Sequence, residues 1–320
     1  MSYQTGDDRG PQSAGPGRGA ARMRFPVGWL LAACCAAVAL AGCGSASGPD
    51  VLTAPIHVVR TTDGTVSYRE LGSGPALLLI TGASTSIDDW PPSFVDALAA
   101  HHTVVVFDNA GVGRTSPVSA PASLGITAMA SQTSALISAL RLHRPAVLGW
   151  SMGGMIAQAL AVNHPAQVSR LILAATTVGT GKAQPLPPSA AQQCACLGLS
   201  PATLVSRLFP TNKAAARAYL NAIAQYPDSY GISTAAFDRQ LLAVQGWVAG
   251  RDAAGRQVAN IRVPTLVAGG TRDQFMVPAN VRLLASTVPG AKLLWFADAG
   301  HAFWFQDAAS FIRAVDSFTG

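Results

Sequence analysis

Short apolar segments alternate with longer amphipathic ones through most of this chain, and this alternation predicts its architecture. Two segments, 57–60 and 65–69, flank Asp63-Gly64, a dipeptide typical of tight turns, and predict a β-hairpin. Later segments are apolar throughout and predict buried strands at 76–80, 103–107, 145–148, 171–174, 265–268 and 292–296. Helical patterns lie between them, for example at 126–142 and 281–288. This order predicts an α/β fold with a mostly parallel sheet, helices on both faces and the hairpin at an antiparallel edge.

The alternation of strands and helices is interrupted between residues 177 and 260. A loop with prolines at 185–188 is followed by three helical patterns, at 202–209, 213–225 and 234–248. We therefore predict a helical lid inserted into the core. The first part of the core spans 56–176, the lid spans 177–260, and the second part of the core spans 261–320.

The N-terminal region has the features of an export signal. Arg22 and Arg24 precede an apolar run at 27–40 that is too short to span a bilayer comfortably. The run ends in Leu40-Ala41-Gly42-Cys43, which resembles the bacterial lipobox, whose cysteine is acylated and becomes the mature N-terminus. We expect an N-terminal extension with a lipoprotein signal peptide at 1–42 and a tether at 43–55. Acylated Cys43 would then anchor the protein on the extracytoplasmic side of the cell membrane.

Two questions about this region stay open at the level of sequence. A plain secretory signal, or a membrane anchor that is retained, is the alternative to the lipobox. Translation starts at either Met1 or Met23, because residues 23–42 alone have a normal signal length.

Composition narrows the function classes. The 320 residues are 49% hydrophobic, which is enough for one large core. The net charge of +6 comes mainly from arginine, and no basic segment is interleaved with aromatic residues, so nucleic-acid binding is not expected. Cleavage before Cys43 would leave Cys194 and Cys196 as the other thiols, either an adventitious or structural pair or a labile redox pair. No histidine lies near them, so a zinc site is not expected.

The most informative motif is Gly149-Trp150-Ser151-Met152-Gly153, which lies between a predicted strand and a predicted helix. A G-x-S-x-G sequence in that position is a nucleophile elbow, a sharp turn that exposes the serine hydroxyl at the end of the sheet. The outer glycines are needed because a Cβ atom there would collide with neighbouring backbone. The pattern therefore identifies Ser151 as a candidate nucleophile at a helix N-terminus, where negative charge is favoured.

A serine nucleophile needs a base, and the base needs an acidic partner. His301 lies in a loop directly after the last predicted strand, whereas the other histidines precede the elbow or end the helix after it. Asp273 follows the strand at 265–268 and is the candidate acid. Asp298 is only three residues before His301 and is expected to cap or solubilise that loop. The chain order Ser, Asp, His supports this set as a catalytic triad.

A tetrahedral intermediate also needs two backbone donors, which form an oxyanion hole. We expect one to be the N–H of Met152, directly after the nucleophile. The other is expected in the loop Thr81-Gly82-Ala83-Ser84, with the N–H of Ala83 as the candidate.

Together these residues resemble the α/β-hydrolase family, in its branch with a helical cap. The match runs from about residue 57 to the C-terminus and includes the elbow, Asp273, Ala299-Gly300-His301 and the glycine-rich loop 108–114. Three features depart from the family pattern: Thr81 replaces a frequent histidine, Ala110 replaces a frequent arginine, and one extra residue separates Asp273 from Pro278.

The resemblance implies hydrolysis of a small-molecule acyl substrate through an acyl-enzyme, with an uncharged carboxylic ester as the default. It implies no cofactor and no metal, and no nucleotide or flavin motif is present. The aromatic residues Trp247, Phe275, Phe303 and Trp304 either line an acyl pocket or belong to the core. Two other functions stay open: a non-catalytic ligand-binding lipoprotein, and a perhydrolase, haloperoxidase-like enzyme or carbon–carbon bond hydrolase that uses the same triad.

Overall fold

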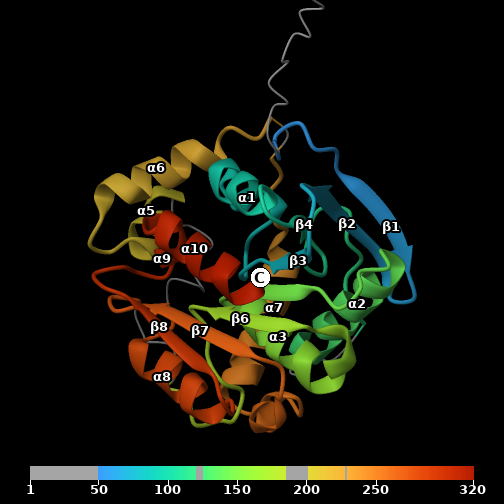
Figure 1. Cartoon of the computed structure of the whole chain (residues 1–320), viewed down its shortest axis with the longest axis vertical. Coiled ribbons are helices and arrows are strands. Elements are labelled where there is room, and N and C mark those ends of the chain that lie inside the picture. The colour runs from blue at the N-terminus through green and yellow to red at the C-terminus, as the bar shows by residue number, and fades with distance from the viewer. Residues whose placement is uncertain (1–49, 120–124, 185–200, 228) are drawn as a thin grey trace, which may run out of the picture. The chain divides into compact units, whose positions relative to one another are not determined.

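The computed structural model describes residues 50–119, 125–184, 201–227 and 229–320. An eight-stranded sheet lies at the centre of this part of the chain (Figure 1). The strand order is β1-β2-β4-β3-β5-β6-β7-β8. The predicted signal peptide, the first part of the tether with Cys43, and the cysteines Cys194 and Cys196 lie outside the described residues, so these expectations remain predictions.

The predicted hairpin and the parallel strands are confirmed. Strands β1 (His57–Thr61) and β2 (Gly64–Leu71) pair antiparallel around the Asp63-Gly64 turn, and β2 pairs antiparallel with β4. All other neighbouring strands are parallel. These strands are β3 (Ala76–Ile80), β4 (Thr103–Phe107), β5 (Ala146–Trp150), β6 (Arg170–Ala174), β7 (Thr265–Gly270) and β8 (Lys292–Phe296).

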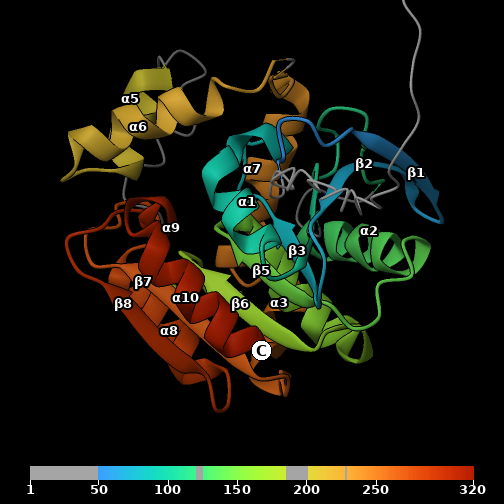
Figure 2. The same cartoon turned by 45° about the horizontal axis from the view of Figure 1, so that its top comes forward.

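Helices cover both faces of the sheet (Figure 2). Alternate strand residues face opposite sides, so Leu77 and Leu79 join one apolar cluster while Leu78 and Ile80 join the other. The first cluster includes residues of α1 (Pro92–Ala99), α9 (Phe303–Gln306) and α10 (Ala308–Thr319). The second includes residues of α2 (Gly125–Ala139), α3 (Met152–Asn163) and α8 (Pro278–Thr287). Short 3₁₀ helices lie at Ile87–Asp89 (η1), Pro165–Gln167 (η3) and Gly255–Asn260 (η4).

The three predicted helices between β6 and β7 are present. They are α5 (Pro201–Leu208), α6 (Lys213–Ile223) and α7 (Thr234–Val248), and we call the segment between β6 and β7 the insertion. Tyr219 of α6 is buried in the first apolar cluster, whereas Val244 and Trp247 of α7 are buried in the second. The insertion is therefore attached to both sides of the core.

Tyrosine hydroxyls join the insertion to the loops that follow β3 and β4. Tyr219 and Tyr226 donate to the backbone oxygens of Asp89 and Trp90, both at 2.8 Å, and Tyr230 donates to the carboxylate of Asp108. Burial raises the pKa of each of these phenols, so the hydroxyls keep the protons that they donate. These bonds hold the insertion above the end of the sheet where β3 and β4 terminate.

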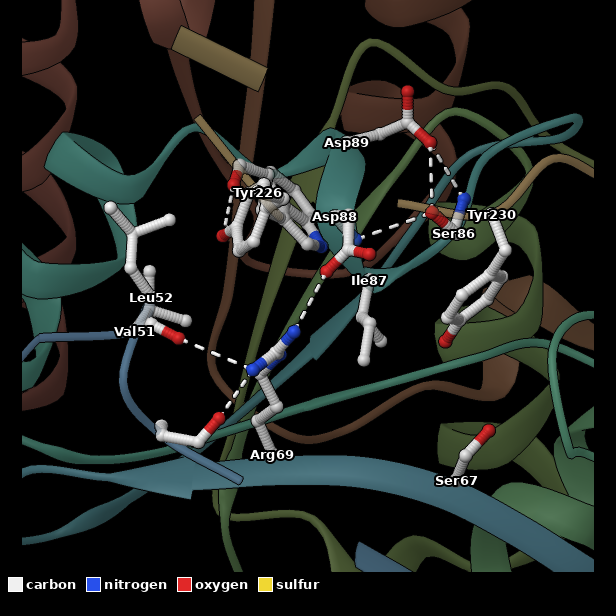
Figure 3. Close-up of polar contacts among 12 residues, drawn as sticks. Val51, Leu52, Ser67, Arg69, Ser86, Ile87, Asp88, Asp89, Tyr226 and Tyr230 are labelled. Carbon is white, nitrogen blue, oxygen red and sulfur yellow. Dashed lines mark hydrogen bonds and ion pairs between the residues drawn. The ribbon is translucent and has the colours of Figure 1, made fainter. Parts of the chain in front are cut away.

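A buried ion pair stabilises the same region. Arg69 of β2 lies 3.2 Å from Asp88 of η1, and both side chains are almost fully buried. Figure 3 shows the Arg69 guanidinium between this carboxylate and the backbone oxygen of Val51. Removing one member of a buried ion pair leaves the other charge without compensation and is strongly destabilising. Arg69 thus links the start of the described chain to the loop after β3.

Asp89, next to this pair, is an acid in an unfavourable environment. Its carboxylate accepts hydrogen bonds from the N–H and hydroxyl of Ser86, at 2.7 and 3.3 Å. Burial nevertheless raises the pKa of Asp89 to about 6, and the neighbouring Asp88 and Asp108 add to the rise. Because the pKa is higher in the folded than in the unfolded chain, ionised Asp89 lowers stability above pH 6, and the penalty shrinks as the pH falls toward 4.

We expect Asp89→Asn to stabilise the protein at pH 7.5 and to do so less at pH 5. The asparagine oxygen can still accept the bond from Ser86 without carrying a charge. The difference in unfolding free energy between variant and wild type should grow by about 1 kcal/mol between pH 5 and 7.5. Urea unfolding at several pH values measures it, with Asp63→Asn in the exposed hairpin turn as the control. A difference that is the same at both pH values would contradict this account.

Candidate active site

Ser151 lies where the chain leaves β5 and enters α3, in a backbone conformation that side chains rarely adopt. Its φ is 56° and its ψ is −118°, and its N–H donates to the oxygen of Ala174 at 2.9 Å. A Cβ atom on Gly149 would lie 2.3 Å from the oxygen of Gly153, and one on Gly153 would lie 2.1 Å from the oxygen of Ile80. Both glycines are therefore required by close backbone contacts, as the motif predicts.

The predicted base and acid meet at the same end of the sheet. His301 follows β8 and Asp273 follows β7, and the imidazole Nδ1 lies 2.8 Å from one carboxylate oxygen of Asp273. The other carboxylate oxygen accepts from the N–H groups of Phe275 and Met276, at 2.8 and 3.0 Å. Both side chains are almost fully buried, at 5% and 0% exposed. Since the carboxylate accepts at Nδ1, the imidazole Nε2 is the nitrogen left to act on a substrate or a hydroxyl.

Close backbone packing brings the two loops together. A Cβ atom on Gly270, the last residue of β7, would lie 2.2 Å from the oxygen of Ala299. The N–H of Arg272 donates to the same oxygen at 2.9 Å. Asp298, the other acid near His301, forms an exposed ion pair with Arg272 at 3.1 Å and lies outside the His301–Asp273 pair.

Trp150 connects the serine to the histidine loop. Its indole N–H donates to the backbone oxygen of His301 at 3.0 Å, and the two rings lie 5.4 Å apart between centroids. Because Trp150 directly precedes Ser151, this bond links the turn that carries the serine to the loop that carries His301. No hydrogen bond joins the Ser151 hydroxyl to His301 in the described part of the chain, and such bonds commonly form only once substrate is bound. The aromatic residue inside the elbow was the only sequence signal for this role.

The loop after β3 lies against the serine. A Cβ atom on Gly82 would lie 3.4 Å from the Cβ of Ser151 and 3.2 Å from the ring of Trp150. Met152 is the first residue of α3 and is fully buried. The assignment of the Ala83 and Met152 N–H groups as oxyanion donors therefore remains a prediction, with the loop in a suitable place.

Two polar side chains that the sequence analysis did not select hold this loop. Asn109 donates to the backbone oxygen and the hydroxyl of Thr81, both at 3.0 Å. Gln240 of α7 accepts from the N–H of Ser84 at 2.9 Å. Asn109 lies in the glycine-rich loop 108–114 and Gln240 lies in no motif, and only the three-dimensional contacts show that both hold the loop after β3.

All four aromatic residues considered for a pocket are buried in the two apolar clusters. Trp247, Phe303 and Trp304 are fully buried. Trp247 donates to the backbone oxygen of Thr177 at 3.1 Å, and Trp304 packs against Trp90 with centroids 4.7 Å apart. Phe275 is 8% exposed, and its ring also lies 5.1 Å from that of His301, measured between centroids.

The described residues contain no group of three or more His, Cys, Asp and Glu side chains placed to hold a metal ion. Within the same residues, no helix is both long and apolar enough to cross a membrane.

Comparisons with known proteins agree on the family. Residues 75–308 match the family model described as "alpha/beta hydrolase fold". The chain is 30% identical to a Mycobacterium tuberculosis protein named as a non-heme bromoperoxidase, BpoC, over 75% of this chain and 92% of that protein. It is 29% identical to an Azorhizobium caulinodans protein named as a carbamate hydrolase, RutD, over 75% of this chain and 89% of that protein.

Other matches support the fold. The chain is 33% identical to the polyketide synthase ThaQ of Burkholderia thailandensis over 77% of this chain, but it spans only 12% of that protein's length. A solved alpha/beta hydrolase fold protein from Chitinophaga pinensis superposes with a TM-score of 0.74, at 24% identity, over 84% of this chain and 98% of that chain. The sheet order, the strained serine and the matched family model lead to one conclusion: this chain belongs to the alpha/beta hydrolase family.

Proposed function

We propose that this protein is a serine hydrolase that cleaves carboxylic esters through an acyl-enzyme. The hydrogen bond between His301 and Asp273, at 2.8 Å and beside the strained Ser151, is the observation that carries the proposal. A non-catalytic binding protein would have no use for a nucleophile in a conformation that costs about 1–3 kcal/mol. Ser151 acts as nucleophile, His301 as base and Asp273 as the partner of the base.

In the first half of the reaction, the Ser151 hydroxyl oxygen attacks the ester carbon, and its proton moves to Nε2 of His301. Asp273 accepts the Nδ1–H of the imidazolium, which stabilises the positive charge and fixes the ring. The carbonyl oxygen becomes an oxyanion that the N–H groups of Met152 and Ala83 stabilise. The bond to the alcohol oxygen then breaks, and His301 returns the proton to the leaving alcohol.

In the second half, water replaces the alcohol. His301 takes a proton from the water as its oxygen attacks the acyl carbon, and the same donors stabilise the second oxyanion. The bond to the Ser151 oxygen then breaks, so that the serine regains its proton and the carboxylic acid leaves. The buried Asp273 accepts two backbone N–H bonds at its other oxygen, and this holds the carboxylate in place through both halves.

An uncharged apolar acyl group suits the surroundings of the reacting atoms. The rings of Trp150 and Phe275 lie within 5.4 Å of the His301 ring, measured between centroids. Apolar surroundings favour the ester over a charged substrate, because burying an unpaired charge is costly. Two acyl chains on Cys43 would hold the enzyme at the outer face of the membrane, where it would meet lipids and other acyl compounds.

A second candidate reaction uses hydrogen peroxide in place of water. Attack of peroxide on the acyl-enzyme would release a peracid and free Ser151, with the proton passing through His301 in the same way. The similarity to BpoC, which covers 92% of that protein, is the observation that favours this alternative.

Ser151→Ala should abolish ester hydrolysis, with a loss of up to about 10⁶ in kcat, because the triad acts as a unit. Steady-state hydrolysis of p-nitrophenyl esters of increasing chain length measures this loss. Ser93→Ala, an exposed serine on α1, is the matched control and should leave the rate unchanged. Retention of most activity in Ser151→Ala would refute the mechanism.

The same esters distinguish the two reactions when hydrogen peroxide is added. We expect the carboxylic acid to stay the main product at millimolar peroxide, as measured by product chromatography. A peracid as the main product would instead support the second candidate.

Acylation of Cys43 predicts that the full chain incorporates an alkyne analogue of palmitate and sediments with membranes. Cys43→Ser should lose both properties, because the thiol that carries the lipid is absent. In-gel fluorescence and fractionation in a bacterial host read the result. Peptides from residues 24–42 in the mature wild-type protein would contradict signal cleavage before Cys43.

A further inference from the structure

The loop that is expected to carry an oxyanion donor is held at three successive peptide groups. Asn109 donates to the oxygen of Thr81 at 3.0 Å, and the hydroxyl of Thr85 donates to the oxygen of Gly82 at 2.9 Å. The N–H of Ser84 donates to the side-chain oxygen of Gln240 at 2.9 Å. Because a peptide group is planar, one hydrogen bond to its C=O or N–H restricts the direction of both.

The middle peptide group is the one that matters for catalysis. The C=O of Gly82 and the N–H of Ala83 belong to the same plane, so the bond from Thr85 aims the Ala83 N–H directly. The N–H of Ser84 belongs to the next peptide group, and the strain lies at this residue. Ser84 has a φ of 66°, in the left-handed region that non-glycine residues rarely adopt. Such a conformation persists only where its surroundings impose it, and the bond to Gln240 is a contact that does so.

Gln240 differs from the other two side chains because it belongs to the insertion. It lies on α7 and is 156 residues away from Ser84 in the sequence. The helix itself is fixed by Val244 and Trp247, which are buried against the second apolar cluster with α2 and α3. The position of α7 is thus transmitted to the loop after β3 through one side chain.

The environment of Gln240 argues against a purely stabilising role. Its side chain is buried, with the residue 2% exposed, and its Nε2 has no hydrogen-bond partner among the described residues. A buried amide donor without a partner costs free energy that an apolar side chain would avoid. The benefit of glutamine at this position therefore lies in the bond that its oxygen makes.

We infer that Gln240 is a positioning residue that couples α7 of the insertion to the oxyanion loop, so that the rate of the chemical steps depends on where α7 lies. The inference rests on the proposed function and adds a regulatory link to that site. Movement of α7 away from the core would remove the acceptor from Ser84 and leave the Ala83 N–H misaligned.

Three variants of the full chain test the inference. Gln240→Leu removes the acceptor at similar volume, Gln240→Glu keeps an oxygen that accepts in either protonation state, and Gln245→Leu repeats the first change at an exposed position of the same helix. Ester hydrolysis gives kcat and KM for each. An alkyl trifluoromethyl ketone, which forms an oxyanion when Ser151 adds to it, gives an inhibition constant that reports on the oxyanion hole.

For Gln240→Leu, we expect kcat to fall by about 10- to 100-fold while KM changes by less than about threefold, because the lost alignment acts on the transition state. The inhibition constant of the ketone should rise by the same factor as kcat falls. Gln240→Glu should recover most of the rate, and Gln245→Leu should match the wild type. Hydrogen exchange of the peptide that contains Ser84 should speed up in Gln240→Leu alone.

Several results would overturn the inference. A Gln240→Leu enzyme with wild-type kcat would show that the bond does not affect catalysis, and an unchanged exchange rate would show that Gln240 does not hold Ser84. A rise in KM alone would place Gln240 in substrate binding instead. A wild-type protein that hydrolyses no ester and does not bind the ketone would contradict the proposed function itself, and this inference with it.

Discussion

The backbone at Ser151 is the constraint on which the rest of the structure depends. The chain turns from β5 into α3 in very little space, and Ser151 makes this turn with a φ of 56°. Side chains at Gly149 and Gly153 would overlap the backbone oxygens of Gly153 and Ile80. The parallel sheet provides the scaffold, since it places the C-terminal ends of β3, β5, β7 and β8 on the same side. The strain at the serine is maintained by that packing, and the hydroxyl is held where the loops after β3 and β8 converge.

Near Ser151, several side chains are both packed in the core and hydrogen-bonded to the backbone of a neighbouring loop. Trp150 fills the apolar space beneath the serine and bonds to the backbone of His301, so packing and catalytic alignment are the same contact. Tyr219 and Tyr226 of the insertion have the same two roles at the loop after β3. Their rings are buried, and their hydroxyls donate to backbone oxygens. Buried polar groups of this kind are costly when left unpaired, which makes the arrangement specific.

Much of this could be predicted from the sequence because the signals are local. Alternating apolar segments place the strands, Asp63-Gly64 places the hairpin, and the glycines around Ser151 place the turn. Asp273 and His301 were selected by their positions after strands, and the structure brings them within 2.8 Å of each other. The roles of Trp150, Asn109 and Gln240 could not be predicted, because each depends on a bond to a residue that is distant in the sequence. The sequence also could not decide whether Trp247 and Trp304 line a pocket, because this depends on how the whole core packs. Both side chains are fully buried in the core.

The central claim is that Ser151 is an activated nucleophile, and covalent labelling tests it most directly. The full chain is treated with an alkyl fluorophosphonate, and the modified peptide is identified by mass spectrometry, with Ser151→Ala as the control. We expect one adduct per molecule, on Ser151, because the reaction needs a serine that an adjacent base activates. Folded wild-type protein that takes up no label, or that carries the label on another residue, would contradict it.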